Sequence, residues 1–245
     1  MFGRRLWSRW AIGVLCSSVL LLAGCGDFFT KDTGGGGGSV GSYVYMGTQI
    51  GVLASYSVST TGALAALSGS PLQLATAGIN SLAVTPSNTF LYAGVAGIGV
   101  YGLSLSSSSG VGTLINTNAL VQDVAPSAIT VDPTGQFLLV AGLANGAAAV
   151  GEYVINSDGT LSEASISPVT ITFPANTDTT NLSIQNIAVA PNSSYVFVTL
   201  GQLGVAPLPY NTSGGLTANT VILTPKATTG GISNQDLGLA VNATS

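Results

Sequence analysis

The sequence predicts an all-β fold in which four-stranded antiparallel sheets repeat along the chain as the blades of a β-propeller. Two observations carry this prediction. Short apolar runs rich in β-branched and aromatic residues alternate with turns that contain glycine, proline, asparagine or serine. One phrase of apolar run, turn and aromatic strand also returns about every 50 residues, which is close to the repeat length of propeller blades.

The clearest copy of the repeat lies between residues 79 and 120. It contains four apolar segments separated by turn-forming residues, and the third alternates with the period of two that a half-buried strand requires. Thr85-Pro86-Ser87-Asn88 supplies the first turn, because proline presets φ and Ser and Asn side chains bond their own backbone. We therefore expect strands at 82–84, 90–93, 100–105 and 113–120.

The same phrase recurs at 128–140 and at 187–198, and another copy begins near residue 239. Asp132 in the second copy is expected to be a turn residue, because its counterparts Thr85 and Ala190 carry no carboxylate. The turn between the third and fourth strands also repeats, as Thr61-Gly62-Ala63-Leu64, Asp158-Gly159-Thr160-Leu161 and Ser213-Gly214-Gly215-Leu216.

The chain enters the repeat at its second strand, because Tyr43–Met46 aligns with Phe90–Ala93. It would then supply strands two to four of one blade, three full blades, and a lone first strand at 237–242. Pairing that last strand with the first three would close a ring of four blades. A β-sandwich or a solenoid also has short strands and frequent turns. A phrase that returns at one place per period favours the propeller.

Residues 83–92 (AVTPSNTFLY) and 129–138 (ITVDPTGQFL) resemble the AVDPSGKFLYV repeats of lactonase-like and YVTN-type seven-bladed propellers. The resemblance covers residues 43–245 and implies a seven-bladed fold, of which about four blades are present. We therefore expect an incomplete part of a larger propeller rather than a four-bladed ring. The resemblance is weak for activity, because blade repeats build the scaffold and function lies in the loops.

Residues 1–24 have the pattern of a bacterial lipoprotein signal peptide, with three arginines, an apolar core and the lipobox Leu22-Ala23-Gly24-Cys25. Cys25 would carry the lipid and begin the mature chain. A transmembrane anchor is the rival interpretation, but the apolar core is shorter than the roughly 20 residues that span a bilayer. Residues 25–42 form a glycine-rich tether, and 43–245 form the propeller domain.

Composition limits the chemistry that the mature chain can perform. Removal of the signal leaves two cations, Lys31 and Lys226, against nine acids, a formal charge of −7. The mature chain has no arginine, and the whole sequence has no histidine. Of the two cysteines, Cys16 would leave with the signal peptide and Cys25 would carry lipid. A Ser/His/Asp triad, an imidazole base and a thiol nucleophile are therefore excluded, and nucleic-acid binding lacks its basic footprint. No catalytic residue, cofactor or metal site is predicted.

Polar side chains gather in the loops that join the fourth strand of one blade to the first strand of the next. The turns between second and third strands should share this face. Loops from several blades meet there, which makes it the expected ligand site, although any one of these side chains could simply solubilise its loop. The candidate ligand-binding residues are Asp123, Asn176, Asp178, Lys226 and Asp236.

Two functions follow from these expectations. The first is a lipid-anchored binding or scaffold module of the bacterial cell envelope, at the periplasmic face or the cell surface, whose partner is a glycan, a peptide or an envelope protein. The second, implied by the resemblance, is a lactone hydrolase similar to 6-phosphogluconolactonase-type propellers, with catalytic residues outside this chain. The missing histidine and arginine favour the first.

Overall fold

The computed structural model describes residues 42–164, 167–213, 215–219, 222–223 and 238–242. The predicted signal peptide, Cys25, nearly all of the tether, Lys226 and Asp236 lie outside these residues. The described residues form strands and loops, and they contain no helix that is long and apolar enough to cross a membrane.

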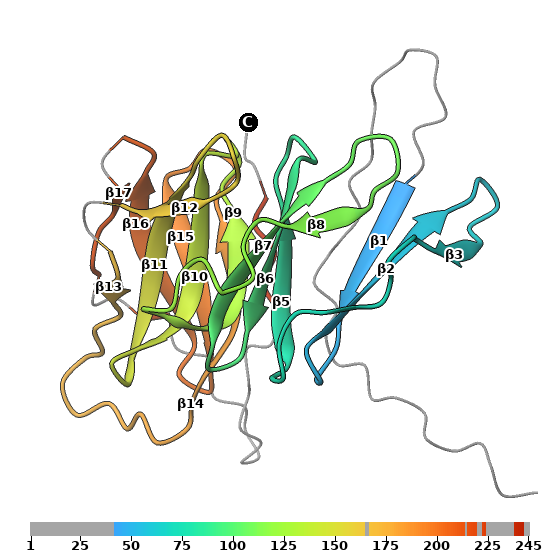
Figure 1. Cartoon of the computed structure of the whole chain (residues 1–245). Coiled ribbons are helices and arrows are strands. Elements are labelled where there is room, and N and C mark those ends of the chain that lie inside the picture. Colours follow the sequence, from blue (N-terminus) through green and yellow to red (C-terminus); the bar gives the residue numbers. More distant parts are fainter. Residues whose placement is uncertain (1–41, 165–166, 214, 220–221, 224–237, 243–245) are drawn as a thin grey trace, which may run out of the picture.

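Four antiparallel sheets follow one another along the chain, and each corresponds to one predicted blade (Figure 1). Blade 1 contains β1 to β4, blade 2 contains β5 to β8, blade 3 contains β9 to β13, and blade 4 contains β14 to β17. The strands are β1 Ser42–Gly47, β2 Val52–Val58, β3 Leu64–Ala66, β4 Leu72–Gln73, β5 Ile79–Val84, β6 Phe90–Val95, β7 Gly99–Leu105, β8 Gly112–Leu114, β9 Ala125–Val131, β10 Phe137–Ala144, β11 Ala147–Ile155, β12 Leu161–Glu163, β13 Val169–Thr170, β14 Leu182–Val189, β15 Tyr195–Gly201, β16 Val205–Asn211 and β17 Gly215–Leu216.

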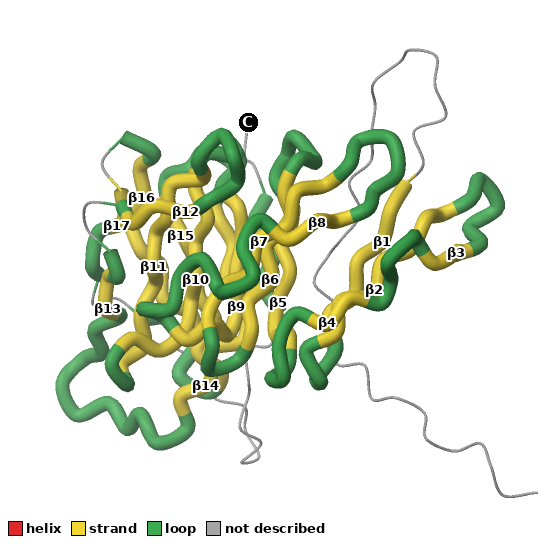
Figure 2. The backbone as a smooth tube through the Cα atoms, viewed as in Figure 1, coloured by secondary structure: helices red, strands yellow, loops and turns green. Residues whose placement is uncertain are grey.

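Within a blade the chain runs from the innermost strand to the outermost, in the order β5-β6-β7-β8 in blade 2. The innermost strands β5, β9 and β14 lie side by side, and blade 1 enters with β1, a second strand, as predicted (Figure 2). The turn after each innermost strand has a left-handed residue at the same position, Asn88 (φ 56°), Gly135 (φ 75°) and Ser193 (φ 51°). The all-β propeller prediction is confirmed.

The outermost strand of each blade differs from the prediction, because it is divided. In blade 2 the expected strand at 113–120 is wrong beyond its first two residues, which belong to β8, and the chain rejoins β7 only at the Val100–Val121 bridge. Between these points the Asn118 amide donates a hydrogen bond to Asn116 Oδ1 (3.2 Å), a local turn that competes with the sheet. Likewise β3 and β4 both pair with β2, and β12 and β13 both pair with β11.

The C-terminal segment corrects a second expectation. Residues 238–242 form no strand, and among the described residues β1 pairs only with β2. Val241 instead lines one cleft together with residues of β5, β9 and β14. Because this segment pairs with no described strand, it lacks the backbone ladder that a strand requires.

The core lies between consecutive blades, in three clusters that each take residues from two blades. Successive side chains of a strand point to opposite faces. Leu138 therefore packs in the cluster between blades 2 and 3, whereas Leu139 packs in the cluster between blades 3 and 4. Strands β6 and β10 are buried on both faces, which is why they read as continuous apolar runs rather than as an alternation.

Tyrosine side chains join the blades through hydrogen bonds to glycine turns. The Tyr45 hydroxyl of blade 1 donates to the Gly110 carbonyl of blade 2 (2.5 Å), and the Tyr92 hydroxyl of blade 2 donates to the Gly159 carbonyl of blade 3 (2.9 Å). Burial, with a smaller contribution from Tyr43, raises the pKa of Tyr45 to about 12. Burial, with a smaller contribution from Asp158, also raises the pKa of Tyr92. Both hydroxyls therefore stay protonated and remain donors.

Both glycines are required by conformation and by space. Gly110 (φ 67°) and Gly159 (φ 80°) are left-handed. A Cβ added at Gly110 would overlap the Tyr43 ring, and one added at Gly159 would lie 2.5 Å from Phe90 Cε1. We call this arrangement the blade clasp: an aromatic ring and a tyrosine two residues later on the second strand of one blade, closed over the glycine turn of the next.

Candidate functional site

The inner strands and the loops at their two ends are the part of this fold where residues of several blades converge. Side chains connect β5 to β9. The Ser81 hydroxyl accepts a hydrogen bond from the Ile129 amide (3.1 Å), and Asn80 Nδ2 donates to the Pro126 carbonyl (3.1 Å). These two hydrogen bonds fix the position at which the loop before β9 ends and β9 begins.

Exposed polar residues collect where β9 and β14 begin and at the β1–β2 turn. Figure 1 places this turn and the loop before β14 at the same edge of the sheets. We call this edge the polar rim, and its residues are Gln49, Gln122, Asp123, Asn176, Asp178 and Asn181.

Asp123 has a structural partner. Its Oδ1 accepts a hydrogen bond from the Tyr153 hydroxyl (2.6 Å), and Tyr153 is buried. Burial and the Asp123 carboxylate raise the pKa of Tyr153 well above its ordinary value, so the phenol remains a donor. Asp123 therefore anchors the loop before β9 to the third strand of blade 3, while the residue itself stays exposed.

Asp178 and Asn176 lie on the long loop between β13 and β14. Asp178 Oδ1 accepts hydrogen bonds from the Thr180 hydroxyl (2.5 Å) and the Thr180 amide (2.9 Å), and these bonds lower the pKa of the carboxyl. Asn176 has φ 67° and is exposed. The loop is thus shaped by its own side chains and presents amide and carboxylate groups to solvent.

The structure places three of the five predicted ligand-binding residues on the polar rim. Asp123 and Asp178 come from the loops of different blades and have separate local partners. Lys226 and Asp236 lie outside the described residues, so their place at the rim stays a prediction.

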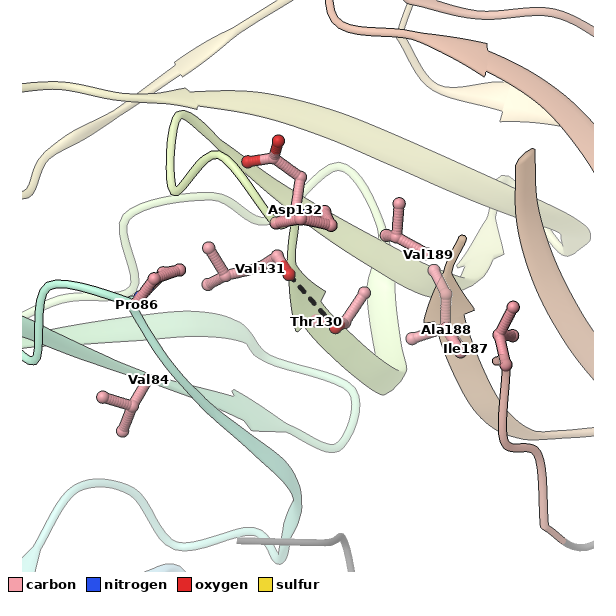
Figure 3. Close-up of a pocket in the computed structure, with 10 residues that line it drawn as sticks. Val84, Pro86, Thr130, Val131, Asp132, Ile187, Ala188 and Val189 are labelled. Atoms are coloured by element: carbon pink, nitrogen blue, oxygen red, sulfur yellow. Dashed lines mark hydrogen bonds between the residues drawn. The ribbon is translucent and has the colours of Figure 1, made fainter. Parts of the chain in front are cut away.

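An apolar cleft of about 420 Å³ lies at the opposite ends of the inner strands (Figure 3). Val84, Val131 and Val189 line it from equivalent positions of β5, β9 and β14, and Pro86 and Pro133 lie at its edge. No rim residue belongs to this lining. Sequence reasoning missed the cleft, because its residues have the ordinary pattern of strand ends.

Asp132 is the one acidic residue that lines this cleft, and its carboxylate is engaged. Oδ1 accepts hydrogen bonds from the amides of Gln136 (2.9 Å) and Phe137 (2.8 Å), and Oδ2 accepts from the Thr134 amide (3.0 Å) and hydroxyl (2.5 Å). Figure 3 shows the carboxylate turned toward the loop that follows β9. The predicted turn role is confirmed.

Glu152 is a buried carboxyl group that sequence reasoning missed. Its side chain is 1% exposed. Glu152 lies on β11 and pairs with Leu139 of β10, and Leu139 stands at the position that the clasp tyrosine Tyr92 has in blade 2. Glu152 Oε2 accepts a hydrogen bond from the Leu216 amide of blade 4 (3.1 Å). Burial raises the pKa of Glu152, Asp132 adds to the rise, and the Leu216 bond opposes it. A lone acid in the apolar segment 147–155 was the available signal.

The arrangement offers two kinds of surface. The rim supplies amides and carboxylate acceptors that suit a polar ligand, and the cleft supplies an apolar wall. Among the described residues, no three or more His, Cys, Asp or Glu residues lie close enough to hold a metal ion.

The fold is a propeller scaffold, and the loops and strand ends at the two ends of its inner strands form the candidate surfaces. Comparison with protein-family models found no match, and neither did comparison with curated proteins. The chain is similar to solved structures of candidate 6-phosphogluconolactonases from Bacteroides uniformis (17% identity, TM-score 0.56, 71% of this chain and 52% of that one) and Bacteroides fragilis (16%, 0.56, 73% and 53%).

A structure of a Lactobacillus plantarum protein is similar to the same degree (18% identity, TM-score 0.57, 71% of this chain and 52% of that one). This chain spans about half the length of the three structures. At these identities the similarity shows the fold, which is a lactonase-like propeller.

Proposed function

We propose that the protein is a binding or scaffold module of the bacterial cell envelope, held to a membrane by lipid on Cys25, which recognises a neutral glycan, a peptide or another envelope protein through the polar rim. The observation that carries this proposal is the rim itself. Exposed polar groups on the loops of blades 3 and 4 lie with the β1–β2 turn at one edge of the sheets, and ligand sites form where loops of a rigid scaffold converge.

Charge favours a neutral ligand. The mature chain would carry a formal charge of −7, and the described residues contain no lysine or arginine. An anionic ligand would be repelled by this field. Amide groups such as Asn176 both donate and accept hydrogen bonds, which suits the hydroxyls of a glycan and the backbone of a peptide.

The test is co-sedimentation of the mature chain with chitin, an insoluble glycan whose N-acetylglucosamine units are neutral. Asp178→Ala and Asn176→Ala are each expected to weaken binding by about fivefold to tenfold, because a lost hydrogen bond costs about 1 to 1.5 kcal/mol.

Asp158→Ala is the matched control. Asp158 accepts hydrogen bonds from the Thr160 hydroxyl (2.6 Å) and amide (3.0 Å), so it makes the same local turn as Asp178, but in a third-to-fourth-strand turn away from the rim. The control should bind as the wild type does. Equal losses for Asp178→Ala and Asp158→Ala, or no sedimentation of the wild type, would count against the rim.

A second candidate function is lactone hydrolysis, which is favoured by the similarity to candidate 6-phosphogluconolactonases. The sequence has no histidine, so catalytic groups would have to come from outside this chain. No turnover of gluconolactone or its 6-phosphate by the protein purified from its native cells, under conditions where an active lactonase hydrolyses both, would remove this candidate.

A further inference from the structure

The first strand determines the side of the propeller to which the predicted tether is joined. Ser42, the first residue of β1, pairs with Val58 at the end of β2. The other end of β1, Gly47, comes just before the β1–β2 turn, which belongs to the polar rim. The chain therefore enters the propeller at the edge opposite the rim. Figure 1 shows the start of β1 at the same edge as the turns that follow β2, β7 and β11.

Hydrogen bonds hold this entry point in place. The Tyr43 hydroxyl donates to the Ser108 carbonyl (3.1 Å), and the Tyr45 hydroxyl donates to the Gly110 carbonyl. Both carbonyls belong to the turn between β7 and β8. The residues that follow the tether are thus fastened to a turn of the next blade. Further blades would extend both edges around the ring and leave the tether at the same edge.

The edge at which the tether enters has few exposed charges. We call it the turn edge, and its described turns are residues 59–63, 85–89, 106–111, 132–136, 156–160, 190–194 and 211–213. Within these turns Asp158 is the one exposed acid, because Asp132 is buried. The polar rim carries two exposed acids, Asp123 and Asp178. Like charges repel, so the turn edge is better suited than the rim to lie against anionic lipid headgroups.

The length of the tether favours the same orientation. A glycine-rich stretch of about 17 residues, from Cys25 to the start of β1, has a root-mean-square length of roughly 20 to 25 Å. The six residues of β1 place the rim about 17 Å beyond the entry point, at about 3.4 Å per residue. A rim in contact with the membrane would require the tether to run back along this whole height. A turn edge in contact with the membrane requires no such extension.

We propose that the turn edge faces the membrane that holds the lipid, and that the polar rim points away from it into the aqueous space of the envelope. This inference rests on the proposed anchoring at Cys25. The partner of the turn edge is then the headgroup surface of the bilayer. The ligand of the rim must lie in the aqueous space, because the headgroups of the anchoring bilayer are at the opposite end of the propeller.

Tryptophan fluorescence tests this orientation, because both tryptophans of the sequence lie in the predicted signal peptide. The mature chain receives a single tryptophan at an exposed position, by Ser107→Trp or Ser157→Trp on the turn edge, or by Gln122→Trp or Asn181→Trp on the rim side. Cys25, its sole cysteine, is coupled to a maleimide phospholipid in the outer leaflet of preformed vesicles. These contain phosphatidylethanolamine, phosphatidylglycerol and a lipid whose spin-labelled headgroup quenches tryptophan. The two turn-edge variants should lose fluorescence, and the two rim variants should keep theirs.

A chain anchored at the rim is the matched control. Cys25→Ser with Gln49→Cys moves the same phospholipid to the β1–β2 turn, and the order of quenching should then reverse. For the chain anchored at Cys25, equal quenching at both edges, no quenching at either edge, or stronger quenching at the rim would overturn the proposal. Chemical coupling supplies the anchor, so these results do not depend on lipidation in cells. Failure of the proposed anchoring would appear separately, as a Cys25 that cells do not label with a fatty-acid analogue.

Discussion

Replacing Gly159 by alanine tests whether the blade clasp holds the blades together. The new Cβ would lie 2.5 Å from Phe90 Cε1, 2.6 Å from Ile115 Cδ1 and 2.6 Å from Phe90 Cδ1. Real Cβ atoms do not approach so closely, so the Phe90 ring or the turn must move. The Tyr92 hydrogen bond to the Gly159 carbonyl is then displaced as well.

The expected cost has two parts. Left-handed backbone costs an alanine about 1–2 kcal/mol, and overpacking a filled core site costs about 1–3 kcal/mol. Gly159→Ala should therefore lower the free energy of unfolding by about 2–5 kcal/mol, measured by urea denaturation of the mature chain with far-UV circular dichroism. Gly146→Ala has the same φ of 80° and open space around the added Cβ, so its free energy of unfolding should fall only by the cost of the left-handed backbone.

The Phe90→Ala background completes the test. Without the ring, Gly159→Ala should cost less than it does in the wild type, since only the backbone strain and the contact with Ile115 Cδ1 remain. The clasp reasoning fails if Gly159→Ala and Gly146→Ala destabilise the wild type equally, or if removal of the Phe90 ring leaves the cost of Gly159→Ala unchanged.

Three further predictions concern single side chains. Tyr92→Phe should lower the free energy of unfolding by about 1–2 kcal/mol, because the Gly159 carbonyl loses its buried donor; Tyr195→Phe is the exposed control, and equal effects would contradict this role. The folded pKa of Glu152 lies above its ordinary value of 4.5. At pH values between the unfolded and the folded pKa, the folded chain binds more protons than the unfolded chain, so the free energy of unfolding falls as pH rises through this range. Glu152→Gln should remove this fall, which begins as pH rises above about 4.5, and an unchanged slope would show that another group titrates. Cys25→Ser should abolish labelling by a fatty-acid analogue, and a labelled variant would show that the lipobox interpretation is wrong.

Local chemistry explains why the sequence alone determined the fold. Strand period, turn residues such as Pro86 and Asn88, and the return of one phrase each depend on neighbours in the chain, so they can be read without knowing what packs where. The sequence also indicated that Asp132 is a turn residue, because the other copies of the phrase lack its carboxylate.

Only the tertiary structure decided the features that depend on a neighbouring blade. The burial of Glu152 and its bond to Leu216 join residues 64 positions apart. Gly110 and Gly159 looked like ordinary turn glycines until the rings of Tyr43 and Phe90 were seen over them. The apolar cleft forms because the ends of three inner strands converge, and the outer strands divide because local turns outcompete a single ladder at an edge. Such contacts are set by the packing of one repeat on the next, which the pattern within a repeat does not contain.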